Sequence, residues 1–186
     1  MKLDIHLYGD PVLRQKAEPV REVNDEVRAF AQDLIDTMRA EHGVGLAAQQ
    51  VGRPLAICVI EVPVEYDTDE DGQRLHPDLA MPLVLINPEI VDASRKLDGH
   101  EEGCLSFPGI RGSIQRHMDI VLRHLDEHGR PHERKLREFV ARVVQHEIDH
   151  LNGILFIDRM SAPKRFALKR KLAEMRRETE ERLGLG

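Results

Sequence analysis

The chain has 186 residues, a formal net charge of −6 at pH 7, 41% hydrophobic residues and 32% charged residues. These values fit one globular domain, residues 1–186, with a sizeable core. The chain opens at Met1 without a long apolar run, so we expect neither a secretory signal nor a membrane span. Two cysteines are too few for a disulfide scaffold, and we expect a cytoplasmic protein.

The elements expected in chain order are those of an α+β domain. A helix is predicted from Asp25 to Glu41, because its apolar residues recur on one face. Asn24 can cap this helix and Gly43 can end it. A second helix is predicted over 139–150, and the apolar run 154–157 is expected to return to the sheet. Strands are predicted at 55–62, 83–91 and 118–125, and at 133–137 after a turn at 126–131.

Two further segments differ in charge from the rest of the chain. The acidic, proline-bearing stretch 63–82 is interpreted as an inserted surface loop without an assigned role. Residues 161–186 hold eight Lys or Arg and four Glu, a balance of +4, which leaves −10 for residues 1–160. Leu168, Leu172 and Met175 mark an apolar stripe, so a basic amphipathic helix is predicted over about 161–183. Most such helices are packed on one side and solvated on the other.

The segment Gln145-His146-Glu147-Ile148-Asp149-His150 indicates a metal site. Residues four apart share one face of a helix, so His146 and His150 can bind one ion while Glu147 lies beside them as a general base. Gly153 supplies a plausible helix end. A chain rich in His and Glu can also contain HExxH by coincidence, and the motif alone does not name a reaction.

A catalytic divalent metal usually has three protein ligands and one open position. Cys58 lies in an apolar run and is interpreted as an ordinary core residue of a strand. Cys104 lies in the segment 101–109, EEGCLSFPG, bracketed by Gly103 and by Pro108 and Gly109, where the backbone can approach an ion closely. A lone loop cysteine is usually structural, but beside HExxH Cys104 becomes the candidate third ligand. A thiolate with two imidazoles suits zinc, iron, cobalt or nickel more than magnesium or calcium.

A third glycine-bearing segment, residues 43–50, completes a pattern of motifs. Alone it is a tight connection, because it lacks the lysine of a phosphate-binding loop. Taken together, GVGLAAQQ, EGCLS and QHEIDH resemble, in order, the three signature motifs of the peptide deformylases. The resemblance extends from about Tyr8 to the C-terminal helix, and it includes Gly9–Arg14 and Leu85–Pro88. It implies an α+β fold with mixed or antiparallel sheets around a central HExxH helix, and with N-terminal and C-terminal helices.

The resemblance implies a role for each matching position. Three residues would bind the metal: Cys104, His146 and His150. A metal-activated water would attack the formyl carbon with Glu147 as general acid and base. Gln50, rather than Gln49, would stabilise the oxyanion together with the backbone N–H of Leu105, and the backbone of Gly45 would hold the substrate main chain. The methionine side chain would lie among residues at the family's positions: Val44, His100, Gly103, Phe139, Arg142 and Val143.

The family also implies the cofactor and the partners. Its members remove formate from the N-formylmethionine of nascent chains, with Fe²⁺ in the cell and Zn²⁺, Ni²⁺ or Co²⁺ as substitutes. The basic C-terminal helix would then dock on the ribosome; no DNA or membrane partner is expected. Arg142 departs from an apolar slot, so it either turns outward or pairs with an acid such as Glu102. Asp149 is expected to orient a neighbour or form a salt bridge.

Two other functions stay open at this point. A HExxH peptidase would share the metal and base, although it would usually take another His or Glu as its third ligand, and Cys104 argues against it. A structural zinc module would need a fourth protein ligand, for which no second Cys or His has obvious spacing.

Overall fold

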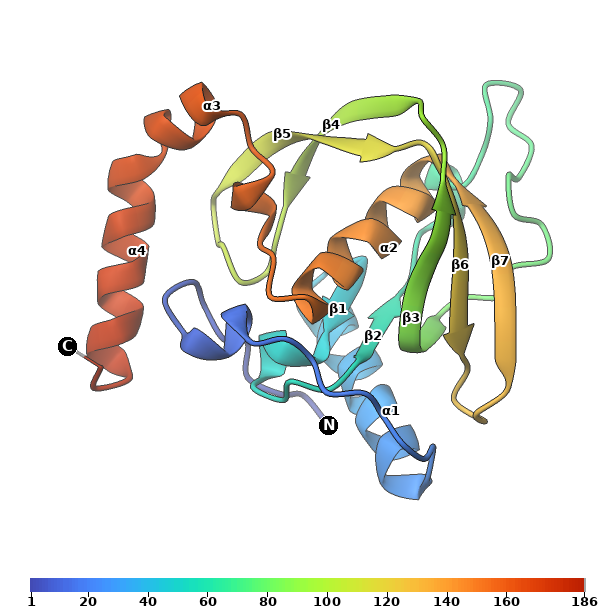
Figure 1. Ribbon diagram of the computed structural model, residues 1–186, viewed down its shortest axis with the longest axis horizontal. Helices are drawn as coiled ribbons and strands as arrows, with labels where there is room; N and C mark the ends of the chain where they lie inside the picture. The colour runs from blue at the N-terminus through green and yellow to red at the C-terminus, as the bar shows by residue number, and fades with distance from the viewer. Residues whose placement is uncertain (186) are drawn as a thin grey trace.

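The computed structural model describes residues 1–185, which form an α+β fold of two antiparallel sheets and four α-helices within that range (Figure 1). The larger sheet has the strand order β1-β2-β3-β6-β7, and the smaller sheet pairs β4 with β5. The strands are β1 (Gly45–Ala47), β2 (Ile57–Ile60), β3 (Leu83–Ala93), β4 (Leu97–Gly103), β5 (Arg111–His117), β6 (Asp119–Leu125) and β7 (Pro131–Arg137). The helices are α1 (Asp25–Ala40), α2 (Glu138–Leu151), α3 (Ala162–Ala167) and α4 (Lys169–Arg182). The expected fold class is confirmed.

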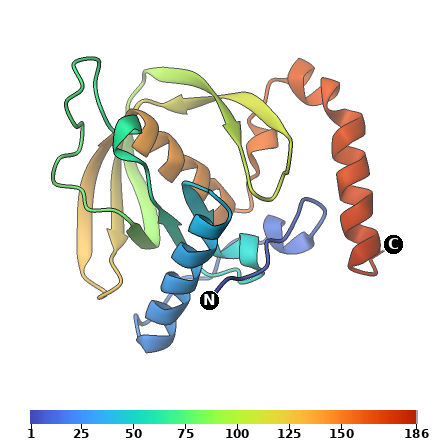
Figure 2. The same cartoon turned by 180° about the vertical axis from the view of Figure 1, so that it is seen from behind.

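Helices α1 and α2 cover opposite faces of the larger sheet (Figures 1 and 2). Successive side chains of a strand point to opposite faces, so β2 can serve both helices. Cys58 and Ile60 pack in the cluster of α2, whereas Ile57 and Val59 pack in the cluster of α1. All four residues are fully buried, which explains why this strand is a continuous apolar run.

Helix α2 lies between the two sheets and carries the HExxH segment (Figure 1). Its apolar side packs against the larger sheet through Val140, Val144 and Ile148. The helix ends as expected: Asn152 is the C-cap, and Gly153 follows with φ of 70°. A side chain at Gly153 would also collide with the carbonyl of Arg14, so glycine is required there on two grounds.

The strand expected at 154–157 is wrong. Phe156–Asp158 forms a 3-10 turn, η4, and the apolar residues Phe156 and Ile157 fill a third core cluster below β5. The single helix predicted over 161–183 is also two helices, α3 and α4, separated at Leu168. Its apolar stripe is confirmed, because Leu168, Leu172 and Met175 belong to or pack against that same cluster. Within residues 1–185, no helix has the length and apolar character needed to cross a membrane.

The acidic insertion 63–82 is anchored more firmly than a surface loop. Asp67 is 1% exposed and accepts a hydrogen bond from the ring of His76 and another from Arg74, the latter at 3.0 Å. His76 Nε2 in turn accepts the backbone N–H of Arg137 at 3.0 Å, where β7 meets α2. The ring of Tyr66 also lies 5.3 Å from that of Phe139 in the first turn of α2. The insertion is therefore fastened to the start of the HExxH helix.

Replacing His76 with leucine should lower the free energy of unfolding by ~2–3 kcal/mol, because the buried Asp67 and the Arg137 N–H would both lose a partner. Urea unfolding curves provide the measurement. His128→Leu is the control, since its side chain is 57% exposed in the β6–β7 turn and its loss should cost within ~0.5 kcal/mol. Equal losses in the two variants would contradict the anchoring role of His76.

Candidate active site

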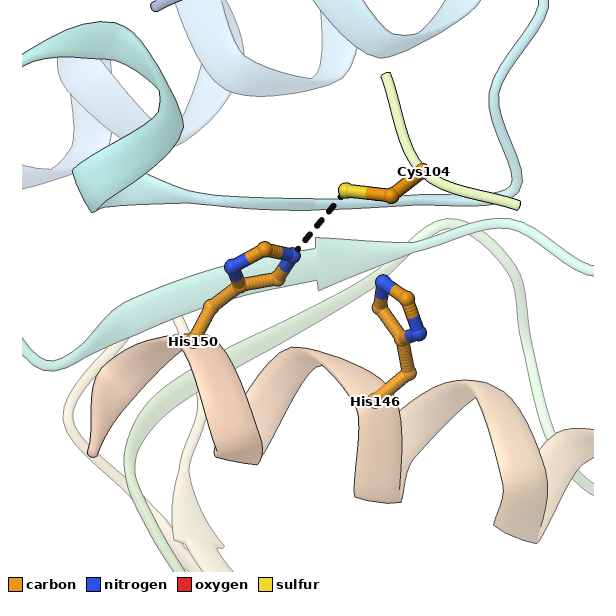
Figure 3. A group of neighbouring side chains, drawn as sticks. All are labelled: Cys104, His146 and His150. Atoms are coloured by element: carbon orange, nitrogen blue, oxygen red, sulfur yellow. Dashed lines mark hydrogen bonds between the residues drawn. The ribbon is translucent and has the colours of Figure 1, made fainter. Parts of the chain in front are cut away.

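Three segments that are far apart in the sequence bring the predicted site together. Helix α2 supplies His146, Glu147 and His150. The connection after β4 supplies Cys104, which faces the two imidazoles in Figure 3. Strand β1 and the 3-10 turn that follows it, η2 (Ala48–Val51), supply the first motif, including Gln50.

The candidate metal ligands form a compact cluster. One donor atom from each of Cys104, His146 and His150 lies within 4.8 Å of the others (Figure 3). Cys104 Sγ lies 3.3 Å from His150 Nε2. His146 Nδ1 is 2.9 Å from Glu102 Oε2, so this nitrogen carries the proton and leaves Nε2 as the metal-binding atom. One soft sulfur and two imidazoles converging at this spacing fit a divalent transition metal.

Glu147 lies beside this cluster with an unusual environment for a carboxylate. It is 4% exposed, and its Oε2 has no hydrogen-bond partner among the described residues. Burial raises the pKa of Glu147 to about 7. Gly45 makes room for the carboxylate, because a side chain at that position would overlap it. A buried carboxyl group that titrates near neutrality is suited to accept and return a proton.

Glutamine 50 is held in one orientation. Its Oε1 accepts the backbone N–H of Ala47 at 2.9 Å, so Nε2 points toward Cys104 Sγ and Ser106 Oγ, at 3.4 and 3.2 Å. Gln49 is fully buried and turns away, with its Nε2 3.5 Å from the carbonyl of Gln15. The structure therefore brings Gln50 and not Gln49 to the cluster, as expected.

A cavity of about 550 Å³ opens above the cluster and is of the size that binds small ligands. Most of the predicted site residues line this cavity: Val44, Gly45, Gln50, Gly103, Cys104, Leu105, Phe139, Arg142, Val143, His146 and Glu147. His150 is 1% exposed and does not line it. His100, which was expected near the methionine slot, does not line it either, and its side chain is 69% exposed and lies 3.1 Å from Asp98.

Charged residues behind the site were only partly foreseen. Arg142 takes the second expected alternative and donates to Glu102 at 2.8 Å. Asp149 forms salt bridges with Arg116 and Arg159. Neither of these arginines was singled out from the sequence, although Arg116 lies two residues after buried Ile114 and so shares its inward face in β5.

The N-terminal segment joins two of the motifs through its backbone. The N–H of His6 donates to the carbonyl of Gln50 at 2.8 Å, and the N–H of Tyr8 donates to that of Ser106 at 2.9 Å. The ring of Tyr8 also stacks on Phe107 with centroids 4.8 Å apart. This segment therefore sets the distance between the first motif and the cysteine motif.

Comparison with known proteins agrees with this geometry. The family model described as polypeptide deformylase matches residues 2–166. A peptide deformylase of Opitutus terrae is 44% identical over 173 residues, which cover 90% of each chain. A crystal structure of peptide deformylase from Ehrlichia chaffeensis has a TM-score of 0.82 at 38% identity and covers 94% of this chain and 96% of that one. One from Synechococcus elongatus in complex with actinonin has a TM-score of 0.79 at 38% identity, with 93% and 85% covered. This chain belongs to the polypeptide deformylase family.

Proposed function

We propose that this chain hydrolyses the N-formyl group, as formate, from the N-terminal formylmethionine of newly made polypeptides. The observation that carries the proposal is the buried Glu147 carboxylate, which lines one cavity with Cys104 and His146, two members of the cluster that His150 completes. An amide hydrolase needs an activated water, donors for a tetrahedral oxyanion and an acid for the leaving amine. The cavity holds residues for each of these tasks.

Cys104, His146 and His150 would hold one divalent ion, which we propose is Fe²⁺ in the cell, with Zn²⁺, Ni²⁺ or Co²⁺ as substitutes. When bound, such an ion supplies water of lowered pKa and polarises a carbonyl. The Glu102 carboxylate keeps the His146 proton on Nδ1 and thereby fixes the imidazole for binding through Nε2. Burial alone would raise the pKa of Glu102, but hydrogen bonds from His146 and Arg116 hold it well below its usual range, so this support stays ionised.

Glu147 moves the proton in this proposal. Its carboxylate, which lines the cavity, takes a proton from the attacking water and then gives it to the departing amine nitrogen. Gln50 Nε2 and the backbone N–H of Leu105 donate to the oxyanion, and one such donor is commonly worth ~3–4 kcal/mol of barrier. Because Ala47 N–H fixes Gln50 Oε1, the donor is already oriented before the substrate arrives.

The cavity wall supports selection of formylmethionine. Val143 is buried, and Phe139 and Val44 are partly buried beside it, so the three can form an apolar slot for a thioether side chain. Gly103 leaves the slot open at the cysteine motif, and the backbone of Gly45 would hold the main chain of the substrate. The Arg142 guanidinium is not an unpaired charge in this slot, because it contacts Glu102 at 2.8 Å and Asp98 at 3.5 Å.

The proposal is tested by formate release from a formylmethionyl tripeptide, assayed anaerobically with iron, nickel and zinc forms of the full chain. We expect formate and the free amine in equal amounts, and no acetate from the N-acetyl form of the same peptide. Cleavage of an internal peptide bond would favour the peptidase alternative. A structural zinc module is disfavoured, because the cluster contains three ligands within the described residues and faces a cavity.

We further propose that residues 1–186 act in the cytoplasm as one catalytic domain and that helices α3 and α4 dock it on the ribosome. These helices carry most of the basic segment, and Phe166 within α3 is 76% exposed. An exposed apolar side chain among exposed cations suits a surface of ribosomal RNA and protein.

The variant Arg165→Gln, Lys169→Gln, Arg170→Gln should reduce co-sedimentation with ribosomes, and added salt should weaken the wild-type association. Lys171 is left in place, because its Nζ donates to the carbonyl of Gly109 at 2.6 Å and Gly109 lines the cavity. Formate release from a tripeptide should stay unchanged. Glutamine has a helix propensity close to that of lysine and arginine, so the helices should persist.

A matched control removes the same charge elsewhere, at three exposed cations: Lys16, Arg21 and Lys96. If both triple variants weaken ribosome binding equally, net charge and not the helices would be responsible, and the docking role would be rejected.

A further inference from the structure

A continuous row of buried charges runs from the metal ligand His146 to the protein surface. Glu102 Oε2 lies 2.9 Å from His146 Nδ1. Arg116 donates to both oxygens of Glu102, from Nε at 3.0 Å and from Nη2 at 2.9 Å, and its Nη1 donates to Asp149. The side chains of Glu102, Arg116 and Asp149 are each less than a tenth exposed. In a low-dielectric interior the position of each such charged side chain depends strongly on its charged neighbours.

Arg159 forms the outer end of this row. Its Nε and Nη2 donate to the two carboxylate oxygens of Asp149, both at 2.6 Å. Its side chain is 44% exposed, against 9% for Asp149. It lies between η4 and α3, outside the helix and the strands that carry the other members. Arg159 therefore reaches inward from the base of the C-terminal helices.

The balance of buried charges indicates a role for Arg159. Arg116 faces two carboxylates, Glu102 and Asp149, and a single guanidinium cannot form a two-pronged pair with both. Glu102 has a second cation, Arg142 at 2.8 Å, whereas Asp149 has only Arg116 and Arg159 among the described contacts. Arg159 satisfies both oxygens of Asp149, so Arg116 can keep its two-pronged pair with Glu102. Without Arg159, the buried Asp149 would draw Arg116 toward itself and leave Glu102 to Arg142 and His146, which would shift the carboxylate on His146.

We propose that Arg159 is a positioning residue for the metal site, which acts through Asp149, Arg116 and Glu102 to hold the His146 imidazole for metal binding. This inference rests on the metal site of the proposed function. Partners of metal-bound histidines commonly change metal affinity 10–100-fold when they are lost, and a more distant partner should act at the lower end of that range. This role differs from stabilising the fold, because the loss of Arg159 should change the orientation of one metal ligand, His146.

The chain contains a matched pair for testing this. Arg14 also forms a two-pronged pair with an aspartate, Asp158, which is the residue next to Arg159. The side chain of Arg14 is 45% exposed, nearly the same as that of Arg159. Asp158 caps the N–H of Leu155 and has no link to the ligand cluster among the described contacts. Arg14 also donates to the carbonyl of Gly153 at 3.3 Å, but it contacts neither a metal ligand nor Glu102, Arg116 or Asp149. Arg14→Met therefore removes a comparable ion pair outside the row of buried charges.

The experiment loads the full chain with Co²⁺ and follows the loss of its visible absorption on addition of EDTA, without substrate. Arg159→Met should release cobalt at least ~10-fold faster than the wild type and should shift the cobalt spectrum. Arg14→Met should stay within about twofold of the wild type and keep its spectrum. Arg159→Lys keeps the charge but not the two-pronged geometry, so its rate of cobalt release should lie between those of Arg159→Met and Arg14→Met.

Equal cobalt release from Arg159→Met and Arg14→Met would overturn the inference. If Arg159→Met fails to fold, Arg159→Lys decides the matter: faster release than from Arg14→Met supports the positioning role, and equal release rejects it. The result is independent of catalysis. A wild type that holds cobalt but releases no formate would reject the proposed reaction and leave this comparison intact.

Discussion

Glu147→Gln should lower formate release by at least ~100-fold while the metal content stays that of the wild type. Glutamine has nearly the same shape as glutamate but cannot take up the proton of the attacking water. Burial raises the pKa of Glu147 to about 7, so the ionised side chain costs folding free energy at and above neutral pH. Removing this charge should therefore leave the melting temperature unchanged or raised, a typical sign of a residue kept for function.

The control is Glu138→Gln, an exposed substitution of the same type in the first turn of the same helix. It should leave formate release and metal content unaltered. Metal analysis and the formate assay on the same preparations separate the two roles of Glu147. Loss of metal in proportion to activity would show that Glu147 supports the metal rather than the proton transfer.

Most helices and strands followed from side-chain periodicity. The Asn24 cap of α1 is confirmed by its hydrogen bond to the N–H of Val27 at 3.0 Å. The turn before β7 is confirmed as well: Asp126 accepts from Arg130 N–H at 2.9 Å, and Gly129 has a φ of 75°. These features are local, so the residues that determine them are neighbours in the sequence.

The small sheet could not be predicted in this way. In β4 only Glu102 is buried, and Leu97 is the only large apolar residue of the strand, so the sequence shows no apolar alternation. It is a strand because its backbone pairs with β5 from Leu97 to Gly103. In β5 the inward face holds Gly112, Ile114 and Arg116, and the buried arginine hides the alternation. The cysteine motif next to this sheet could therefore be recognised in the sequence, whereas the two strands of the sheet could not.

The site residues also fall into those that a local pattern predicts and those that depend on contacts between distant segments. His146, Glu147 and His150 could be placed together from the helical repeat alone. Cys104 and Gln50 come from other elements, and only the order of three motifs linked them to the helix. Arg159 could not be foreseen, because an arginine in a connecting segment is usually a surface residue. Its proposed role depends on the ion pairs that the buried Asp149 forms with it and with Arg116, which is distant from both in the sequence.

Cys104→Ser should lose most of its metal to a chelator and most of its formate release, because an alcohol is a poor substitute for a thiolate ligand. Its stability without metal should change little, since Cys104 lies at the cavity and is only partly buried. Metal content after dialysis against EDTA, formate release and urea unfolding are measured on each variant.

Cys58→Ser should show the opposite result, a loss of stability with the metal retained. Cys58 is fully buried in β2, and burial raises the pKa of its thiol well above the usual value, so it has no thiolate to offer a metal. Placing a hydroxyl there should cost ~1–3 kcal/mol of stability and leave the metal bound. The two substitutions are chemically identical, so metal loss confined to Cys104→Ser, with stability loss confined to Cys58→Ser, can come only from the different places of the two sulfurs. Full metal content and full turnover in Cys104→Ser would reject the ligand assignment.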